Sequence, residues 1–294
     1  MKLANILLDG AEVAVIIEGN RSFPLSRVNH FRNTGFPEHV ISLIREDKLI
    51  GLSEWFRSQV ESRDFIRECS LKTGSLTFLP PFYSPEKIWG IGLNYAGHAL
   101  DLKAKQPDRY PAGFNKPPTT IIGHNETIIV PELSGRTTAE AELGIIIGRE
   151  ARNIKPEKWK QYVAGFVPVI DVTSLDILKL NPRYLSLSKS FDTFFSFGPV
   201  MITPEEFEDI GKLKVATWHN GEEIASNTVD HMRFSPAFLV GFMSRIFTMK
   251  PGDIISTGTP GAAEIKDGDI VEAKISGFPV LKNDIKSVYH GSET

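Results

Sequence analysis

Short apolar segments, each bounded by Gly, Pro or Asn, follow one another from Lys87 to near the end of the 294-residue chain. They read KIWGIGL, TTIIG, TIIVP, LGIIIG, VAGFVPVID, GPVMIT, KVATWH, DIISTG and DIVEAKI. Runs of this length, rich in β-branched residues and ended by turn residues, predict strands. Few of them are separated by helix-length segments, so the pattern favours a meander or barrel-like β domain over a regular βαβ repeat.

The pattern of residues 1 to about 75 predicts a small α/β unit that is N-terminal to this β domain. KLANILLD and EVAVIIEG predict two strands joined around Asp9–Gly10, and HVISLIRE and LSEWFRSQV carry helical spacing. The segment LPPFYSP is a proline-rich joint, because each proline restricts its own φ angle and the residue before it. We therefore expect an α+β protein with an N-terminal domain at 1–75 and a catalytic domain at 80–294.

Two helices and one hairpin are expected within the second domain. One helix begins near Asn94–Tyr95, and SPAFLVGFMSRIF starts with the N-cap and first-turn residues Ser235–Pro236. The sequence HNGE predicts a hairpin, because Asn220–Gly221 supplies the positive φ angles that a type I′ turn requires.

The composition narrows the classes of partner. The formal net charge is −3, both signs are interspersed, and the chain has no basic stripe for a phosphate backbone or an anionic lipid surface. No segment is long enough to span a bilayer, and the N-terminal stretch is too polar for a signal sequence. A single cysteine, Cys69, excludes an internal disulfide framework. We expect a cytoplasmic protein that binds a small molecule, with no nucleic-acid or membrane partner.

Two glutamates stand at the start of the apolar run in TTAEAELGIIIGRE. Because side chains alternate along a strand, Glu140 and Glu142 share one face, roughly 6 to 7 Å apart, and repel each other. The segment VAGFVPVID predicts another buried strand, and the last residue of this segment is an acid, Asp171. Three carboxylates without paired Cys or His suit a hard cation such as Mg²⁺ or Mn²⁺. The residues alone also allow two glutamates on the solvent face of a half-exposed strand and an Asx-type turn at Asp171.

Three further segments carry candidate functional residues. In GIGLNYAGHALDL, His98 and Asp101 lie three apart on the expected helix, so the carboxylate can orient the imidazole; an exposed His near an acid is the alternative. In SLSKSFDTFFSFGPV, Lys189 can bind a carboxylate or an oxyanion, or be a solvated surface lysine. In MKPGDIISTGTPGA, Gly258 allows close backbone approach and Thr259 can hold a carboxylate, unless the loop is structural.

In this order, the motifs resemble those of the fumarylacetoacetate hydrolase family. The resemblance is carried by GIGLNYAGHALD, AEAELGIIIGREARNI, GFVPVIDVTSLD, SKSFDTFFSFGPV, WHNGEEIASNTVDHMRFSPAFLVGFMS and MKPGDIISTGTPG, and covers roughly residues 80 to 285. Several motifs in one order are far more specific than any single motif. The resemblance implies a mixed β-roll catalytic domain, usually found in a homodimer.

The resemblance also implies roles for the candidate residues. It implies a Mg²⁺ or Mn²⁺ ion with three carboxylate ligands, Glu140, Glu142 and Asp171. His98 would act as a general base on water and Asp101 would orient it, while Lys189 would stabilise the oxyanion. Substrate contacts would come from three further residues, Tyr95, Gly258 and Thr259.

The reaction that the resemblance implies is hydrolysis of a carbon–carbon bond in a small 2-oxo or β-diketo acid of acylpyruvate type, through a metal-stabilised enolate. The alternatives are an oxaloacetate-type decarboxylase, a muconate-type keto–enol isomerase and a non-catalytic ligand-binding member. The chain departs from the family pattern in three places: Asp101 where many relatives have Glu, Leu175 in place of the Arg of an Arg-Asp pair, and a short loop after Pro260.

Overall fold

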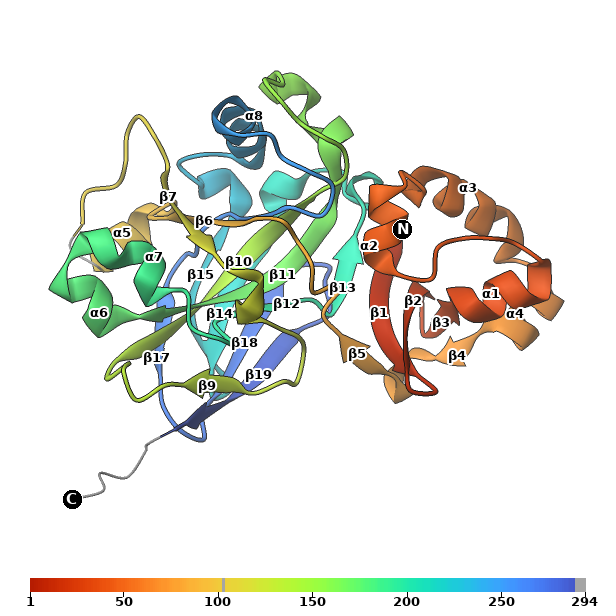
Figure 1. Ribbon diagram of the computed structural model, residues 1–294, viewed down its shortest axis with the longest axis horizontal. Coiled ribbons are helices and arrows are strands. Elements are labelled where there is room, and N and C mark those ends of the chain that lie inside the picture. The colour runs from red at the N-terminus through yellow and green to blue at the C-terminus, as the bar shows by residue number, and fades with distance from the viewer. Residues whose placement is uncertain (102–103, 289–294) are drawn as a thin grey trace.

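The chain folds into two β-sheets with helices around them (Figure 1). The computed structural model describes residues 1–101 and 104–288, and at Asp101 it describes the backbone alone. The larger sheet has 14 strands, drawn from the N-terminal and C-terminal parts, and the smaller sheet has 5, all from the C-terminal part. Antiparallel and parallel pairs both occur. The expected mixed α+β class is confirmed.

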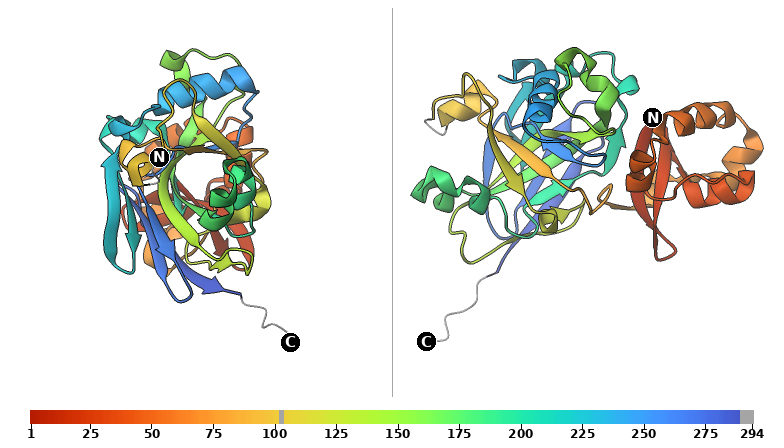
Figure 2. Two further views of the ribbon diagram at one scale, coloured as in Figure 1. Left: turned by 90° about the vertical axis from the view of Figure 1, so that its left-hand side faces the viewer. Right: turned by 45° about the horizontal axis from the view of Figure 1, so that its top comes forward.

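The N-terminal elements form one end of the molecule, apart from most of the C-terminal strands (Figure 2). They are β1 (Lys2–Leu8), β2 (Ala11–Glu18), β3 (Arg21–Pro24), α1 (Leu25–Arg32), α2 (Val40–Arg45), α3 (Leu49–Gln59), α4 (Arg63–Cys69), β4 (Leu71–Lys72) and β5 (Thr77–Leu79). β1 and β2 form the predicted hairpin, with Asp9 at φ 51° and Gly10 at φ 81°. β1 also pairs with β13 (Val200–Ile202), so the larger sheet runs across both parts. The division into domains at 1–75 and 80–294 stays a prediction.

One apolar core runs from the N-terminal elements into the larger sheet. Phe23 stacks on Phe65 with 5.4 Å between ring centroids and meets Phe56 edge-on at 5.0 Å. The same cluster of buried residues contains Phe197 and Ile254 from the C-terminal part. Burial of this shared apolar surface holds the two parts together.

The C-terminal part supplies the remaining strands. In the larger sheet these are β6 (Ile88–Gly92), β7 (Ala112–Lys116), β8 (Ile121–Ile122), β10 (Thr137–Ile147), β11 (Val163–Ser174), β12 (Phe195–Phe197), β16 (Ile254–Ser256) and β17 (Ala262–Ile265). The smaller sheet consists of β9 (Ile128–Val130), β14 (Lys214–His219), β15 (Glu222–Thr228), β18 (Ile270–Ile275) and β19 (Leu281–Ser287). Asn220 and Gly221, at φ 50° and 87°, form the turn between β14 and β15, which confirms the predicted Asn-Gly hairpin.

Helices border these sheets. The α-helices of the C-terminal part are α5 (Ala96–Asp101), α6 (Leu175–Leu180), α7 (Leu185–Ser188) and α8 (Pro236–Ile246). The short 3₁₀ helices are η1 (Thr73–Ser75), η2 (Pro118–Thr120), η3 (Pro156–Tyr162), η4 (Pro182–Tyr184), η5 (Pro204–Glu206), η6 (Ile210–Lys212) and η7 (Val229–His231). Helix α8 has the predicted cap, because the Ser235 side chain accepts the N–H of Phe238 at 3.3 Å. Both expected helices of the second domain are therefore present.

The long strands β10 and β11 form the centre of the C-terminal part. They pair antiparallel, every residue of both is buried, and Glu140 lies directly opposite Asp171. The alternative that Glu140 and Glu142 face solvent on a half-exposed strand is therefore wrong. Asp171 is also inside its strand rather than at the end, since β11 continues to Ser174. Residues 143–147 of β10 and 163–170 of β11 form apolar runs without polar alternation because both faces of these strands are covered.

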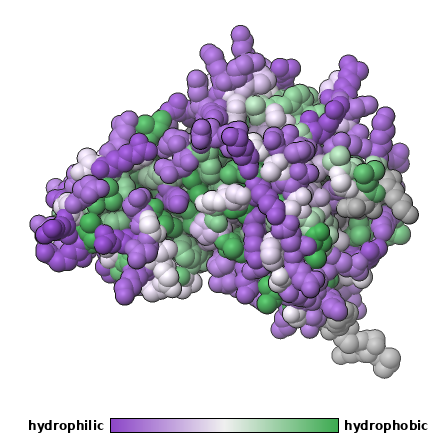
Figure 3. Space-filling view, turned by 180° about the vertical axis from the view of Figure 1, so that it is seen from behind, coloured by the Kyte–Doolittle hydropathy of each residue, from purple (hydrophilic) through white to green (hydrophobic). Residues whose placement is uncertain are grey.

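Helices α5, α6 and α7 lie at the end of the molecule opposite the N-terminal elements (Figures 1 and 2). On the face drawn in Figure 3, hydrophilic residues surround several separate groups of apolar ones. Within residues 1–101 and 104–288, no helix combines the length and the apolar character needed to cross a membrane.

Candidate functional site

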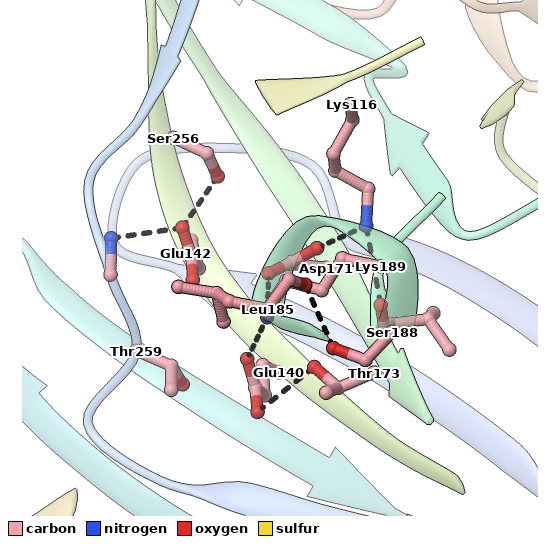
Figure 4. A network of polar contacts seen from close by, with 12 residues as sticks. Lys116, Glu140, Glu142, Asp171, Thr173, Leu185, Ser188, Lys189, Ser256 and Thr259 are labelled. Atoms are coloured by element: carbon pink, nitrogen blue, oxygen red, sulfur yellow. Dashed lines mark hydrogen bonds and ion pairs between the residues drawn. The ribbon is translucent and has the colours of Figure 1, made fainter. Parts of the chain in front are cut away.

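Three buried carboxylates meet on the face of the sheet where β10 and β11 pair (Figure 4). One oxygen atom from each of Glu140, Glu142 and Asp171 lies within 4.8 Å of the others. The strand period of two places Glu140 and Glu142 on one face, and the pairing register brings Asp171 beside Glu140. The structure thus brings together the three acids that the sequence singled out.

Two buried lysines compensate part of this negative charge. The Lys189 Nζ atom lies 3.1 Å from Glu140 Oε2 and also donates to Asp171 Oδ2. The Lys116 Nζ atom lies 2.6 Å from Asp171 Oδ1 and donates to the Val172 carbonyl oxygen at 3.2 Å. Sequence reasoning found Lys189 but missed Lys116. The available signal was a lone lysine between an apolar strand and two prolines in AGFNKPP.

An aromatic ring packs against the lysines. The Nζ atom of Lys189 lies 4.5 Å from the centroid of the Phe114 ring, at the distance of a cation–π contact. The ring in turn packs on the backbone of Gly90 in the neighbouring strand, where a Cβ atom would come within 2.1 Å of it. Only glycine therefore fits at this position with the ring where it is.

The third acid, Glu142, is held by the end of β16 and the loop that follows this strand (Figure 4). Its Oε2 atom accepts hydrogen bonds from the Ser256 hydroxyl and, at 2.8 Å, from the backbone N–H of Gly258. Gly258 has a φ of 96°, and a Cβ there would lie 2.7 Å from the Asn94 side chain. The glycine is therefore required both by its backbone angle and by the space available.

The charges shift one another's pKa values. Burial, reinforced by the negative charge of Asp171, raises the pKa of Glu142 to about 8. Burial would raise the pKa of Asp171 as well, but Lys116 and Lys189 outweigh it and the net shift is downward. Burial lowers the pKa of Lys116 to about 8 despite the attraction of Asp171. For Lys189, burial is outweighed by the surrounding carboxylates, and its pKa is raised.

This donor set fits a hard divalent cation. The three groups offer oxygen atoms only, which Mg²⁺ and Mn²⁺ prefer over softer metals. The lysines form ion pairs with Glu140 and Asp171, whereas Glu142 forms none with the described residues, and burial raises its pKa. A divalent cation beside Glu142 would supply the missing positive charge.

A cavity of about 480 Å³ opens beside the acids. Glu140, Glu142 and Lys189 form part of its wall, together with two threonines, Thr138 and Thr173. Helices α6 and α7 contribute mainly leucines to the wall. The cavity has the volume of a small-ligand site and combines a few charged groups with much apolar surface.

The other predicted residues lie in different places. His98 is 5% exposed and lines the cavity, and its Nδ1 atom has no hydrogen-bond partner among the described residues. The Asp101 side chain lies outside what the structure describes. Thr259 lines the cavity and donates to the Gly261 carbonyl oxygen at 2.9 Å. Tyr95 is fully buried in the apolar core, and burial raises the pKa of its hydroxyl.

Two of the solved structures that resemble this chain each cover nearly all of it. One is the 5-carboxymethyl-2-hydroxymuconate delta-isomerase of Mycobacterium smegmatis, with a TM-score of 0.76 and 25% identity, covering 98% of this chain and 100% of that one. The other is the maleylpyruvate hydrolase of Sphingobium sp. SYK-6 in complex with manganese(II) ion and pyruvate, with a TM-score of 0.79 and 24% identity over the same shares. At that identity the second likeness concerns the fold.

Sequence comparison identifies the family. The mitochondrial oxaloacetate tautomerase Fahd2a of Rattus norvegicus is 34% identical over 218 residues, which make up 71% of this chain and 69% of that protein. The sequence pattern described as fumarylacetoacetate (FAA) hydrolase C-terminal matches residues 87–286, which include every acid and lysine of the cluster. The chain therefore belongs to the fumarylacetoacetate hydrolase family.

Proposed function

We propose that this protein is a divalent-metal-dependent enzyme that hydrolyses a carbon–carbon bond in a small 2-oxo acid of acylpyruvate type. The observation that carries the proposal is the buried cluster of Glu140, Glu142 and Asp171, whose two glutamates line a cavity that His98 also lines. The manganese in the maleylpyruvate hydrolase structure supports a metal in this fold. Cytoplasmic location and homodimer formation remain predictions.

The three acids would hold Mg²⁺ or Mn²⁺, and the ion would polarise the 2-oxo carbonyl of the substrate as a Lewis acid. His98 faces the cavity and would take a proton from water as the water adds to the distal carbonyl. The carbon–carbon bond would then break, a carboxylic acid would leave, and the electron pair would stay on the pyruvate fragment, whose carbon would take up the proton that His98 removed from water. The Lys189 ammonium, buried beside the acids, would stabilise negative charge on the substrate oxygens.

A second candidate is keto–enol tautomerisation of a 2-oxo acid, because the rat relative is named an oxaloacetate tautomerase. That reaction moves a proton without adding water, so His98 would exchange a proton with a substrate carbon. The two reactions differ in whether an oxygen atom of water enters the product.

The discriminating experiment supplies acylpyruvates, oxaloacetate and a muconate-type diacid in ¹⁸O-labelled water, with Mg²⁺ or Mn²⁺ or with a chelator. We expect metal-dependent release of pyruvate from an acylpyruvate and one ¹⁸O atom in the released carboxylic acid. Enzyme-dependent enol-to-keto conversion of oxaloacetate without cleavage would instead establish the tautomerase, and CO₂ release above the rate with metal alone would establish a decarboxylase.

Replacing His98 with Gln is expected to lower the turnover number by about 10² to 10⁴-fold, because this is the usual contribution of a general base. Binding of Mn²⁺, measured by titration calorimetry, should stay unchanged, since His98 is not one of the clustered acids. The control is His30→Gln, at an exposed position on α1. Cleavage by His98→Gln at the wild-type rate would refute the role of His98.

A further inference from the structure

We infer that the cavity selects 2-oxo monocarboxylates with an apolar distal group and disfavours dicarboxylates. This inference rests on the proposed function, because it assumes that the 2-oxo carboxylate end binds at the acid cluster. It concerns the rest of the substrate, which lies against the cavity wall.

The wall formed by α6 and α7 presents aliphatic side chains to the cavity. Leu175, Leu178 and Leu185 all line it, and Leu175 is only 7% exposed. Leu185, labelled in Figure 4, lines the same cavity as Glu140 and Glu142. A substrate whose first carbons sit at the acids therefore meets leucine surface with its next carbons.

Few charged groups are available to a second carboxylate. Among the described residues, two lysines and no arginine line the cavity. One is Lys189, which is already paired with two acids, and the other is Lys179. Lys179 is exposed, so its attraction for a carboxylate is weakened by water. A carboxylate placed against Leu175 and Leu178 instead loses its hydration without gaining a donor, which is strongly unfavourable.

The charge of the cluster points the same way. Among the described residues it contains three carboxylates and two ammonium groups, which together carry one net negative charge when all are ionised. A divalent cation would turn this into one net positive charge. The carboxylate of a monoacid neutralises that charge, whereas a dicarboxylate leaves an excess negative charge in a buried region, where an unpaired charge is costly.

The test measures binding by titration calorimetry to the full chain with Mg²⁺, using 2-oxo acids that have no bond to hydrolyse. The probes are pyruvate, 2-oxobutanoate, 2-oxopentanoate and 2-oxohexanoate, and the dicarboxylates are 2-oxoglutarate and 2-oxoadipate. We expect Kd to fall by about fourfold for each added methylene group, the gain typical of burying one CH₂. Each dicarboxylate should bind about tenfold or more weakly than the monoacid with a chain of similar length.

Two leucines of the same helix provide a matched pair of variants. Leu178→Ala should remove most of the gain from chain lengthening, because it removes cavity wall, while pyruvate binding stays close to wild type. Leu180→Ala should keep the full gain, because Leu180 is 80% exposed and does not line the cavity. The melting temperature of each variant without ligand checks that the fold is kept.

Three outcomes would overturn the inference. If pyruvate binds but longer monoacids bind no better, the apolar selectivity is refuted while the proposed function stands. The apolar selectivity is also refuted, and the proposed function stands, if 2-oxoadipate binds as tightly as 2-oxohexanoate. Loss of that affinity in Lys179→Gln would then identify a dicarboxylate site at the cavity mouth. If no 2-oxo acid binds in the presence of Mg²⁺, both the inference and the proposed function fail.

Discussion

Replacing Glu142 with Gln is expected to weaken Mn²⁺ binding by more than about 100-fold, because even the hydrogen-bond partners of metal ligands contribute 10- to 100-fold to affinity. Metal-dependent activity should fall with it. The fold should be kept, since Gln has the same size and its carbonyl oxygen can still accept from Ser256 and Gly258. Titration calorimetry with Mn²⁺, the melting temperature and turnover of an acylpyruvate measure the three effects.

The control for this prediction is Glu150→Gln, which removes an exposed carboxylate paired with Lys250. It should leave Mn²⁺ affinity and turnover at wild-type values. Wild-type Mn²⁺ affinity in Glu142→Gln, or full wild-type activity in metal-stripped buffer, would show that the cluster is not the metal site.

Local geometry was sufficient to predict that Glu140 and Glu142 share one face, and the family resemblance added Asp171 to them. The period of two along β10 fixes that Glu140 and Glu142 share a face, whatever the rest of the fold. The apolar run after them predicts a buried strand, and β10 is buried throughout. The position of Asp171 within β11 was not predicted, because an acid after an apolar run is typical of a turn at a strand end, although Val172 and Thr173 favour a strand.

Contacts between distant segments could not be predicted in the same way. Lys116 and Asp171 are 55 positions apart, and a lone lysine before two prolines does not indicate which acid its ammonium group will meet. Likewise, the pairing of β1 with β13 joins residues about 200 positions apart, so the continuity of the larger sheet is a property of tertiary structure. The repulsion between Glu140 and Glu142 predicted a compensating cation, and the structure adds that lysines provide part of the compensation.

Lys116 offers a test of that shared compensation. Lys116→Met is expected to destabilise the metal-free protein by about 3 kcal/mol, the lower end of the usual loss when one partner of a buried ion pair is removed. The lower end applies because Asp171 keeps its contact with Lys189. A loss of this size corresponds to roughly 6 to 12 °C in Tm, which differential scanning calorimetry measures.

The change in Mn²⁺ affinity caused by Lys116→Met should be opposite in direction to the change caused by Glu142→Gln. Mn²⁺ is expected to bind Lys116→Met more tightly than wild type and to restore part of its stability, because an ammonium that competes for Asp171 is gone and the ion supplies positive charge. Lys250→Met is the matched control, since it breaks an exposed pair and exposed pairs contribute little. Two results would contradict this prediction: Lys116→Met is as stable as wild type without metal, or Mn²⁺ binds Lys116→Met more weakly than it binds wild type. Either result would show that Lys116 and a metal ion do not both neutralise the charge of Asp171.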